Sequence, residues 1–332
     1  MNGHATKTRD YALDNIRALL IFAVVFGHLL ELCGPFEGQW QIYRVIYSFH
    51  MPAFIFLFGY NARFSLRRIL LRWCLPYGVY QFLYVAFATR VLGDAQPLQF
   101  TTPYWLLWYM MVCIFYQLML PLVGTDDRRL QGLMLGGSVA LALLAGFVDE
   151  VGYPLSLSRL VVFLPWFLLG HYARRDDLLR RIAERPRARQ IATVAALIAA
   201  VALTPVVMQI PNTLLFGSYS YAACGGALWM RALAGLMAEA VIVLLFVGLT
   251  PWLNRRIPLI TNIGQHTWPV FVLHGFVLRG GERVLWQYMN SPWLAAALAA
   301  GLVLLLGNRD MGVLADWIGL SWMEKLVDRK LR

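Results

Sequence analysis

Long apolar runs separated by short polar segments dominate the pattern of hydrophobic and polar positions along the chain. A helix needs about 20 mostly apolar residues to cross the roughly 30 Å hydrocarbon core of a bilayer, and many of these runs approach that length. We expect membrane-spanning helices near residues 13–32, 42–61, 69–90, 104–123, 131–148, 157–173, 190–209, 232–250, 260–279 and 293–307. The pattern therefore predicts an all-α, polytopic membrane protein with a bundle of about ten transmembrane helices.

The polar segments are too short to hold a second folded unit, and the chain shows neither an internal repeat nor a low-complexity linker. We therefore expect a single transmembrane domain over residues 1–332. The tail at 308–332 places Trp317, Trp322 and Leu326 among basic residues. This mixture is typical of an amphipathic helix that lies at a membrane surface, so the tail is predicted to be an interfacial helix.

Composition excludes the soluble classes of protein. Of the 332 residues, 59% are hydrophobic and 14% are charged, whereas soluble domains are about one quarter charged. The net charge of +11 does not indicate a nucleic-acid partner, because the basic residues form short clusters between apolar runs and not one continuous stripe. The partner that the composition predicts is the lipid bilayer.

The basic clusters also predict the topology. With the amino terminus in the cytoplasm, most of the 29 lysine and arginine residues fall on cytoplasmic segments, as the positive-inside rule requires. Both termini are therefore predicted to be cytoplasmic. The abundance of Ala, Leu and Arg favours a bacterial source, with the plasma (inner) membrane as the location. Its four cysteines have no metal-ligand spacing, so no metal site is expected.

Ionisable residues inside a membrane span are costly and usually functional. Arg17 and His28 are eleven residues apart in the first span, which places them within about 20° of one helix face and about 16 Å apart along the axis. They can therefore line one cavity, and Glu31, one turn beyond His28, can orient the His28 imidazole. The alternatives are a snorkelling arginine and a buried neutral histidine that bonds a backbone carbonyl.

An arginine cluster follows the second span, at Arg63, Arg67, Arg68 and Arg72. Arg68 and Arg72 are four residues apart and share a helix face, where two guanidinium groups can hold an anionic phosphate ligand that arrives from the cytoplasm. Ordinary positive-inside anchoring explains the same cluster without any ligand.

Two further histidines, both well inside predicted spans, are also of interest. His50 precedes Pro52, which removes a backbone donor and predicts a kink at a cavity wall. His274 lies in the ninth predicted span. Both are candidates for the substrate cavity, although a structural role satisfies either residue.

Several of these motifs, in this order, resemble the type 3 membrane acyltransferase family. Arg17 and His28 are similar to its R-x10-H signature, Phe49-His50-Met51-Pro52 to its second-helix motif, and Arg68-x-x-x-Arg72 to its R-x-x-x-R motif. Three more stretches resemble the branch described as fucose 4-O-acetylase-like: Leu107-Trp108-Tyr109-Met110, Ser156-Leu157-Ser158-Arg159, and Ile263-Gly264-Gln265-His266 through His274. No nucleotide-binding loop, zinc-protease motif or serine-hydrolase motif accompanies them.

The resemblance implies a ten-helix bundle that takes an acyl group, in the first instance acetyl, from cytoplasmic acetyl-CoA to a hydroxyl of a sugar in a cell-surface or exported glycan. It implies that His28 is the general base and that Arg17 binds CoA or stabilises developing negative charge. The cofactor-binding candidates are then Arg17, Arg63, Arg68 and Arg72, and the substrate-cavity candidates are His50, Trp108 and His274. Some members of the family carry an extracytoplasmic domain that completes the transfer. No such domain is expected in this chain, so the resemblance implies that any transfer partner is a separate protein.

Two other classes of function remain open from the residues. Many helices with buried charges also suit a transporter or flippase of a lipid-linked sugar, although the chain lacks an evident repeat. A non-catalytic envelope scaffold would leave the spacing of Arg17 and His28 without a purpose.

Overall fold

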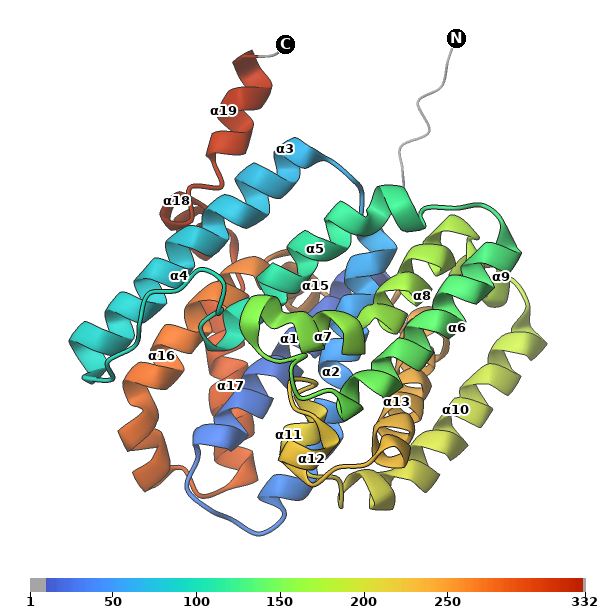
Figure 1. The fold of residues 1–332 in the computed structure, drawn as a ribbon, viewed down its shortest axis with the longest axis horizontal. Coiled ribbons are helices and arrows are strands. Elements are labelled where there is room, and N and C mark those ends of the chain that lie inside the picture. Colours follow the sequence, from blue (N-terminus) through green and yellow to red (C-terminus); the bar gives the residue numbers. More distant parts are fainter. Residues whose placement is uncertain (1–9, 331–332) are drawn as a thin grey trace.

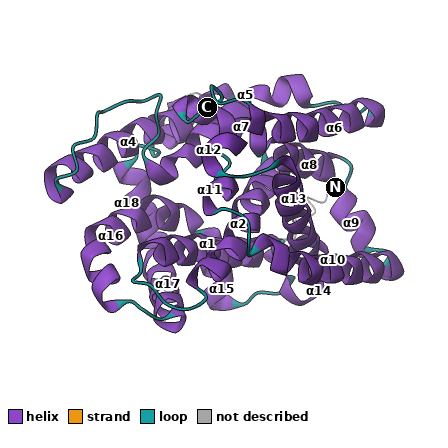
Figure 2. Ribbon diagram, turned by 60° about the horizontal axis from the view of Figure 1, so that its bottom comes forward, coloured by secondary structure: helices purple, strands orange, loops and turns teal. Residues whose placement is uncertain are grey.

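The computed structural model describes residues 10–330, apart from the side chains at 325 and 328–330. Within that range the chain forms helices, turns and loops and no strand, which Figure 2 shows at a glance. The all-α prediction is confirmed for these residues. Within residues 10–330, six helical segments are long and apolar enough to cross a membrane: α1 (Tyr11–Leu32), α2 (Gln39–Asn61), η3 with α5 (Trp105–Val123), α6 with η4 (Arg128–Phe147), α10 (Pro186–Val207) and α13 with η6 (Leu228–Gly248).

Two bent pairs raise the number of candidate spans in the described chain to eight. The segment η5 with α7 (Pro154–Val162) meets α8 (Leu164–Arg175) at 59°, and α17 (Pro292–Leu306) meets α18 (Arg309–Ile318) at 75°. The predicted count of about ten is therefore not confirmed. The placement of both termini in the cytoplasm stays a prediction.

The two predicted spans without a counterpart are 69–90 and 260–279. The first becomes α3 (Leu66–Ile69), the π-helical η1 (Leu70–Cys74), α4 (Leu75–Phe87) and the π-helical η2 (Ala88–Leu92). The second is interrupted at His266, between α15 (Pro258–Gln265) and α16 (Thr267–Tyr288). Charged residues explain both departures, since Arg72 and Arg90 lie in the first segment and α16 continues through Arg279 and Glu282.

Short helices complete the bundle between the long ones. They are α9 (Leu178–Ala183), α11 (Asn212–Leu215), α12 (Tyr221–Cys224), α14 (Thr250–Leu253) and α19 (Met323–Lys330). Figure 1 shows α19 beside α3, at the end of the molecule where the predicted arginine cluster lies. The tail predicted at 308–332 is helical in α18 and α19, its last two residues lie outside the described residues, and its position at a membrane surface stays a prediction.

Helix α1 runs through the centre of the bundle and packs on α2, α15, α16 and α17. It begins where the Asp10 side chain accepts a hydrogen bond from the Leu13 backbone amide, because such an acceptor satisfies one of the free amides of a first turn. The contact with α15 is so close that a Cβ atom on Gly264 would lie 1.7 Å from the Asp14 carbonyl oxygen. Glycine at 264 therefore fixes the position of α1.

Helices α2 and α8 cross through a pair of glycines. A Cβ atom on Gly59 would lie 2.2 Å from the Phe167 carbonyl oxygen, and one on Gly170 would lie 2.0 Å from the Phe56 carbonyl oxygen. Small residues allow membrane helices to approach closely, so that van der Waals packing between their backbones holds them together. This crossing fixes the face of α2 that carries His50.

Gly170→Ala is expected to lower the free energy of unfolding by about 2 kcal/mol or more, because overpacking forces the two backbones apart. The thermal midpoint in detergent measures the change. Gly136→Ala is the matched control, since Gly136 also lies inside a helix but a Cβ there meets no atom within 4 Å. Equal midpoints for the two variants would contradict the crossing.

Candidate active site

A cavity of about 440 Å³ lies between α1, α2, η1, α5, α7 and α16. Helix α1 lines it with Arg17, Ile21, Val24 and His28, whose spacing of three or four residues keeps them on one helix face. The structure thus places Arg17 and His28 on one cavity wall, as their spacing predicts.

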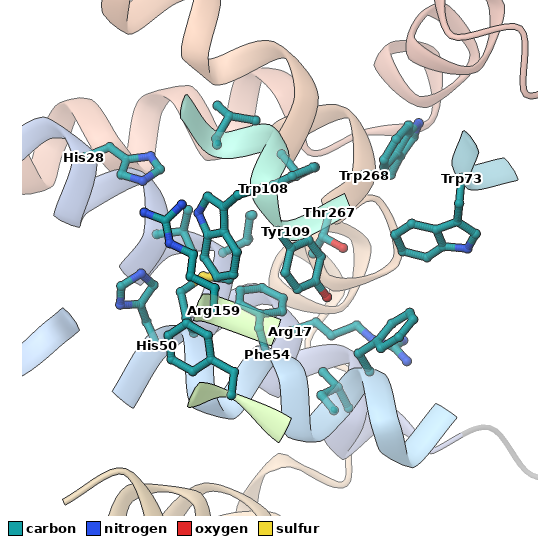
Figure 3. Close-up of a pocket in the computed structure, with 18 of the residues that line it drawn as sticks. Arg17, His28, His50, Phe54, Trp73, Trp108, Tyr109, Arg159, Thr267 and Trp268 are labelled. Atoms are coloured by element: carbon teal, nitrogen blue, oxygen red, sulfur yellow. The ribbon is translucent and has the colours of Figure 1, made fainter. Parts of the chain in front are cut away.

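The two ends of this inner cavity differ in chemistry (Figure 3). One end, which we call the histidine end, holds His28, His50 and Arg159. The other, the arginine end, holds Arg17 and Trp73, and Arg72, which precedes Trp73 in the chain, also lines the cavity. The walls between are mostly apolar and aromatic, so they offer a ligand mainly apolar contacts.

His28 does not act alone, because its ring meets the ring of His274 from α16. The His28 Nδ1 and His274 Nε2 atoms are 3.0 Å apart, and the His274 Nδ1 atom is 2.7 Å from the Val270 carbonyl oxygen. A carbonyl only accepts, so His274 donates from Nδ1 and, when neutral, accepts at Nε2. His28 therefore donates from Nδ1, which leaves its Nε2 atom as a proton acceptor.

Of the three substrate-cavity candidates, His50 and Trp108 line the inner cavity, whereas His274 lies behind His28 and is fully buried; a role in substrate binding stays a prediction. The His50 Nδ1 atom lies 2.8 Å from the Ile46 carbonyl oxygen and donates to it. The Trp108 ring stacks on Phe163 at 5.5 Å between centroids. His50 thus combines the structural role that its sequence allows with a position on the cavity wall.

Glu31 is not brought to His28. The carboxylate accepts a hydrogen bond from the Tyr47 hydroxyl at 3.4 Å and lines different cavities. The place beside His28 that the spacing assigned to Glu31 is taken by His274, which lies 246 positions further along the chain in α16. A residue three positions along the same helix lies to one side of the ring, whereas α16 faces the ring directly.

Arg17 is held by a buried carboxylate one turn earlier. Its Nη1 atom lies 2.9 Å from Asp14 Oδ1, and Asp14 also accepts from the Gln265 side chain at 3.3 Å. The Asp14 side chain is 5% exposed, whereas that of Arg17 is 28% exposed. The arginine is therefore charge-balanced, and its remaining surface faces the cavity.

Arg68 and Arg72 converge on one carboxylate, that of Glu324 in α19. Arg68 Nε lies 3.4 Å from Oε1, and Arg72 Nη1 lies 3.7 Å from Oε2. The shared helix face predicted from their spacing is therefore present, with a carboxylate in the place of a phosphate. Arg72 also lines the arginine end, whereas Arg68 does not, and Arg63 is exposed in the loop after α2.

Sequence reasoning gave no role to Arg159, which the structure places at the histidine end. Its Nε atom donates to the Phe216 carbonyl oxygen at 3.0 Å, and its guanidinium group lies 4.7 Å from the Trp108 ring centroid. In the described part of the chain its Nη1 atom is buried without a hydrogen-bond partner. A charge inside an apolar run was the available signal, the same one that singled out Arg17.

A strained turn aims Arg159 into the cavity. Leu155 and Ser156, just before α7, have φ angles of 52° and 51°, a region that residues other than glycine rarely adopt. Such strain persists where the surrounding structure demands it, and it gathers at functional sites. No cluster of three or more His, Cys, Asp or Glu residues arranged to hold a metal ion occurs in residues 10–330.

A helical bundle whose apolar spans enclose buried arginines and a histidine pair is a multi-pass membrane protein with an internal polar site. Residues 10–307 match the acyltransferase domain family. This chain therefore belongs to that family. The narrower resemblance to the fucose 4-O-acetylase-like branch stays a prediction.

Similarity to a curated protein is confined to a short stretch. Over 66 residues the chain is 36% identical to Nodulation protein NolL of Sinorhizobium fredii (strain NBRC 101917 / NGR234). The alignment covers 19% of this chain and 18% of that protein. No solved structure matches the chain.

Proposed function

We propose that the protein is an integral membrane O-acyltransferase. It moves an acyl group, in the first instance acetyl, from cytoplasmic acyl-CoA to a hydroxyl of a sugar in a cell-surface or exported glycan. The observation that carries the proposal is the hydrogen bond between His28 and His274, because it favours the tautomer in which His28 Nε2 can accept a proton at one end of a mostly apolar cavity. Membership of the acyltransferase family supports the same reaction class.

The donor occupies the inner cavity from its arginine end. Phosphate groups of CoA bind Arg68 and Arg72, with Arg63 nearby on the same segment. The pantetheine arm passes Arg17, and the thioester reaches the histidine end. Shielding by the apolar walls protects the thioester from hydrolysis until an acceptor arrives.

Acyl transfer follows at the histidine end. The acceptor hydroxyl oxygen attacks the thioester carbonyl carbon while its proton passes to His28 Nε2. The carbon–sulfur bond then breaks, and the CoA thiolate takes that proton and leaves as a thiol. His274 accepts the His28 Nδ1 hydrogen throughout and so keeps the ring in the reactive tautomer. Glu31 takes no step in this reaction.

Arg159 stabilises the negative charge that develops on the carbonyl oxygen. Its Nη1 donor is buried at the histidine end and lacks a partner among the described residues. A fixed donor in a water-excluded site stabilises a transition state strongly, because it needs no reorganisation when the charge appears. This role, which the sequence offered to Arg17, fits Arg159 better because Arg17 is paired with Asp14.

The cellular setting follows from the same proposal. Donor access from the cytoplasm places the arginine end and both termini on the cytoplasmic side of a bacterial plasma membrane. A glycan acceptor then lies on the opposite side, where a separate extracytoplasmic transfer partner can complete the modification.

Acetyl-CoA is expected to raise the thermal midpoint of the purified protein, because a ligand that binds only the folded state stabilises it. The double variant Arg68→Ala/Arg72→Ala should abolish this rise, because it removes both guanidinium groups that bind the CoA phosphates. Arg128→Ala is the matched control, as Arg128 is an exposed arginine paired with Asp176 away from the cavity. An unchanged rise in the double variant would contradict the donor site.

A further inference from the structure

A second cavity of about 440 Å³ lies on the other side of His28 from the arginine end. A third, open cavity of about 1120 Å³ adjoins it and shares Glu31, Asp94 and Arg279. We call the second one the outer cavity. Its polar and aromatic lining comprises Glu31, Gln81, Asp94, Gln96, Gln99, Thr102, Tyr104, Trp105, Tyr153 and Arg279.

The wall between the inner and outer cavities is about one side chain thick. Each of three contacts joins a residue that lines the inner cavity to one that lines the outer cavity. They are His28 with Trp105 at 4.8 Å between ring centroids, Tyr47 with Glu31 at 3.4 Å between side-chain oxygens, and Arg159 with Tyr153 at 5.0 Å from guanidinium to ring.

Trp105 is the part of this wall that covers His28. Its neighbour Leu106 lines the inner cavity, so the turn η3 (Trp105–Leu107) separates the two spaces. The φ angle of Trp105 is 36°, a value that is unfavourable for a residue with a large side chain. Such a conformation persists because the surrounding structure maintains it, and Trp105 has it at the point where the two cavities meet.

The segment that precedes Trp105 is held in place by several hydrogen bonds, of which Gln81 makes three. The Gln81 Nε2 atom donates to the carbonyl oxygens of Gln99 at 2.7 Å and Thr102 at 3.0 Å. Its Oε1 atom accepts from the Tyr104 amide at 2.8 Å. The backbone of residues 99–104, which borders the outer cavity, is therefore held in place up to the residue before Trp105.

The lining of the outer cavity suits a ligand with many hydroxyl groups. The side-chain amides of Gln96 and Gln99 can donate to hydroxyls and accept from them, whereas the carboxylate of Asp94 accepts. Aromatic rings, such as those of Trp105 and Tyr153, offer flat apolar faces with polar edges. Carbohydrates combine hydroxyl groups with apolar ring faces, so both parts of the lining have a counterpart.

We propose that the outer cavity binds the carbohydrate acceptor and that the Trp105 ring is a movable partition between this acceptor and His28. The inference rests on the proposed function, because it supplies the hydroxyl for that reaction. When the ring swings aside, one acceptor hydroxyl reaches His28 Nε2 and the thioester carbonyl. When it is closed, the thioester is kept from water on the outer side.

Trp105→Ala tests the partition with water as the acceptor. In the full-length protein in lipid nanodiscs, loss of the ring is expected to raise the rate of acetyl-CoA hydrolysis about fivefold or more, since water then reaches the thioester. Trp293→Ala is the matched control, because Trp293 is 82% exposed in α17 and lines neither cavity. Acetyl-CoA binding by titration calorimetry is measured for every variant.

A second variant tests whether raised hydrolysis in Trp105→Ala comes from an opening between the two cavities or from a general loosening of the protein structure. Gln96→Cys in the Trp105→Ala chain places a thiol at the outer cavity, and a bulky maleimide on it should return hydrolysis to the wild-type rate. Methyl glycosides added to the unlabelled Trp105→Ala protein should divert the acetyl group from acetate to a sugar ester. A panel of neutral methyl hexosides and deoxyhexosides serves as the probe.

Each outcome bears on a different claim. Failure to bind acetyl-CoA would reject the proposed function itself. Binding with unchanged hydrolysis in Trp105→Ala, or hydrolysis that the maleimide leaves raised, would overturn the partition. Raised hydrolysis with no ester on any glycoside would overturn the carbohydrate assignment of the outer cavity.

Discussion

His28→Ala is expected to lower kcat for acyl transfer by about 10² to 10⁴, because the acceptor hydroxyl loses the group that takes its proton. In the proposed function the phosphates of the donor bind at the other end of the inner cavity, so the affinity for acetyl-CoA should be unchanged. Release of CoA thiol in single-turnover experiments, together with donor titration, measures the two quantities separately.

His266→Ala is the matched control for His28. It removes a histidine whose Nδ1 atom lies 2.8 Å from the Asn262 carbonyl oxygen, outside the lining of the inner cavity. Its kcat should stay within about twofold of wild type, as for a substitution away from a site. Normal transfer by folded, membrane-inserted His28→Ala would reject His28 as the general base.

Arg159→Gln should lower kcat by about 10² to 10³, the loss expected when one oxyanion donor is removed. Arg159→Lys should recover only part of it, because a single ammonium group does not reproduce the placement of a guanidinium group. Chemical-step rates at saturating acetyl-CoA test the prediction, and equal rates for wild type and Arg159→Gln would exclude the role.

Arg231 provides a control with the same burial and chemistry. It is 8% exposed, its guanidinium lies 4.9 Å from the Tyr221 ring, and it donates to the Ala142 and Tyr219 carbonyl oxygens. It does not line the inner cavity. Arg231→Gln is therefore expected to lower the thermal midpoint while the kcat per folded molecule stays near wild type.

Periodicity within one helix predicted which of these side chains lie on the same face. The spacing of Arg17 and His28 depends only on the turn of α1, and that of Arg68 and Arg72 only on one helical face. Both pairs lie as their spacing predicts. Local geometry of this kind needs no knowledge of the neighbouring helices.

Contacts between distant helices could not be predicted in the same way. His274 reaches His28 because α15 ends at Gln265 and α16 starts afresh at Thr267, a break that the apolar pattern concealed. Arg159 follows a turn in which Leu155 and Ser156 have positive φ angles. Neither residue is a glycine or an asparagine, so nothing in the sequence indicates this turn. The assignment of Glu31 to His28 failed for the same reason, since a closer partner arrived from elsewhere in the chain.

If the donor binds as proposed, the carboxylate of Glu324 in α19 competes with it for Arg68 and Arg72. A CoA phosphate that takes Arg68 and Arg72 must displace this carboxylate, so donor binding and the release of α19 from these arginines become one event. Exposed ion pairs of this kind contribute about 0 to 1 kcal/mol each, so a multiply charged phosphate can displace them. The position of α19 would then report whether the inner cavity holds the donor.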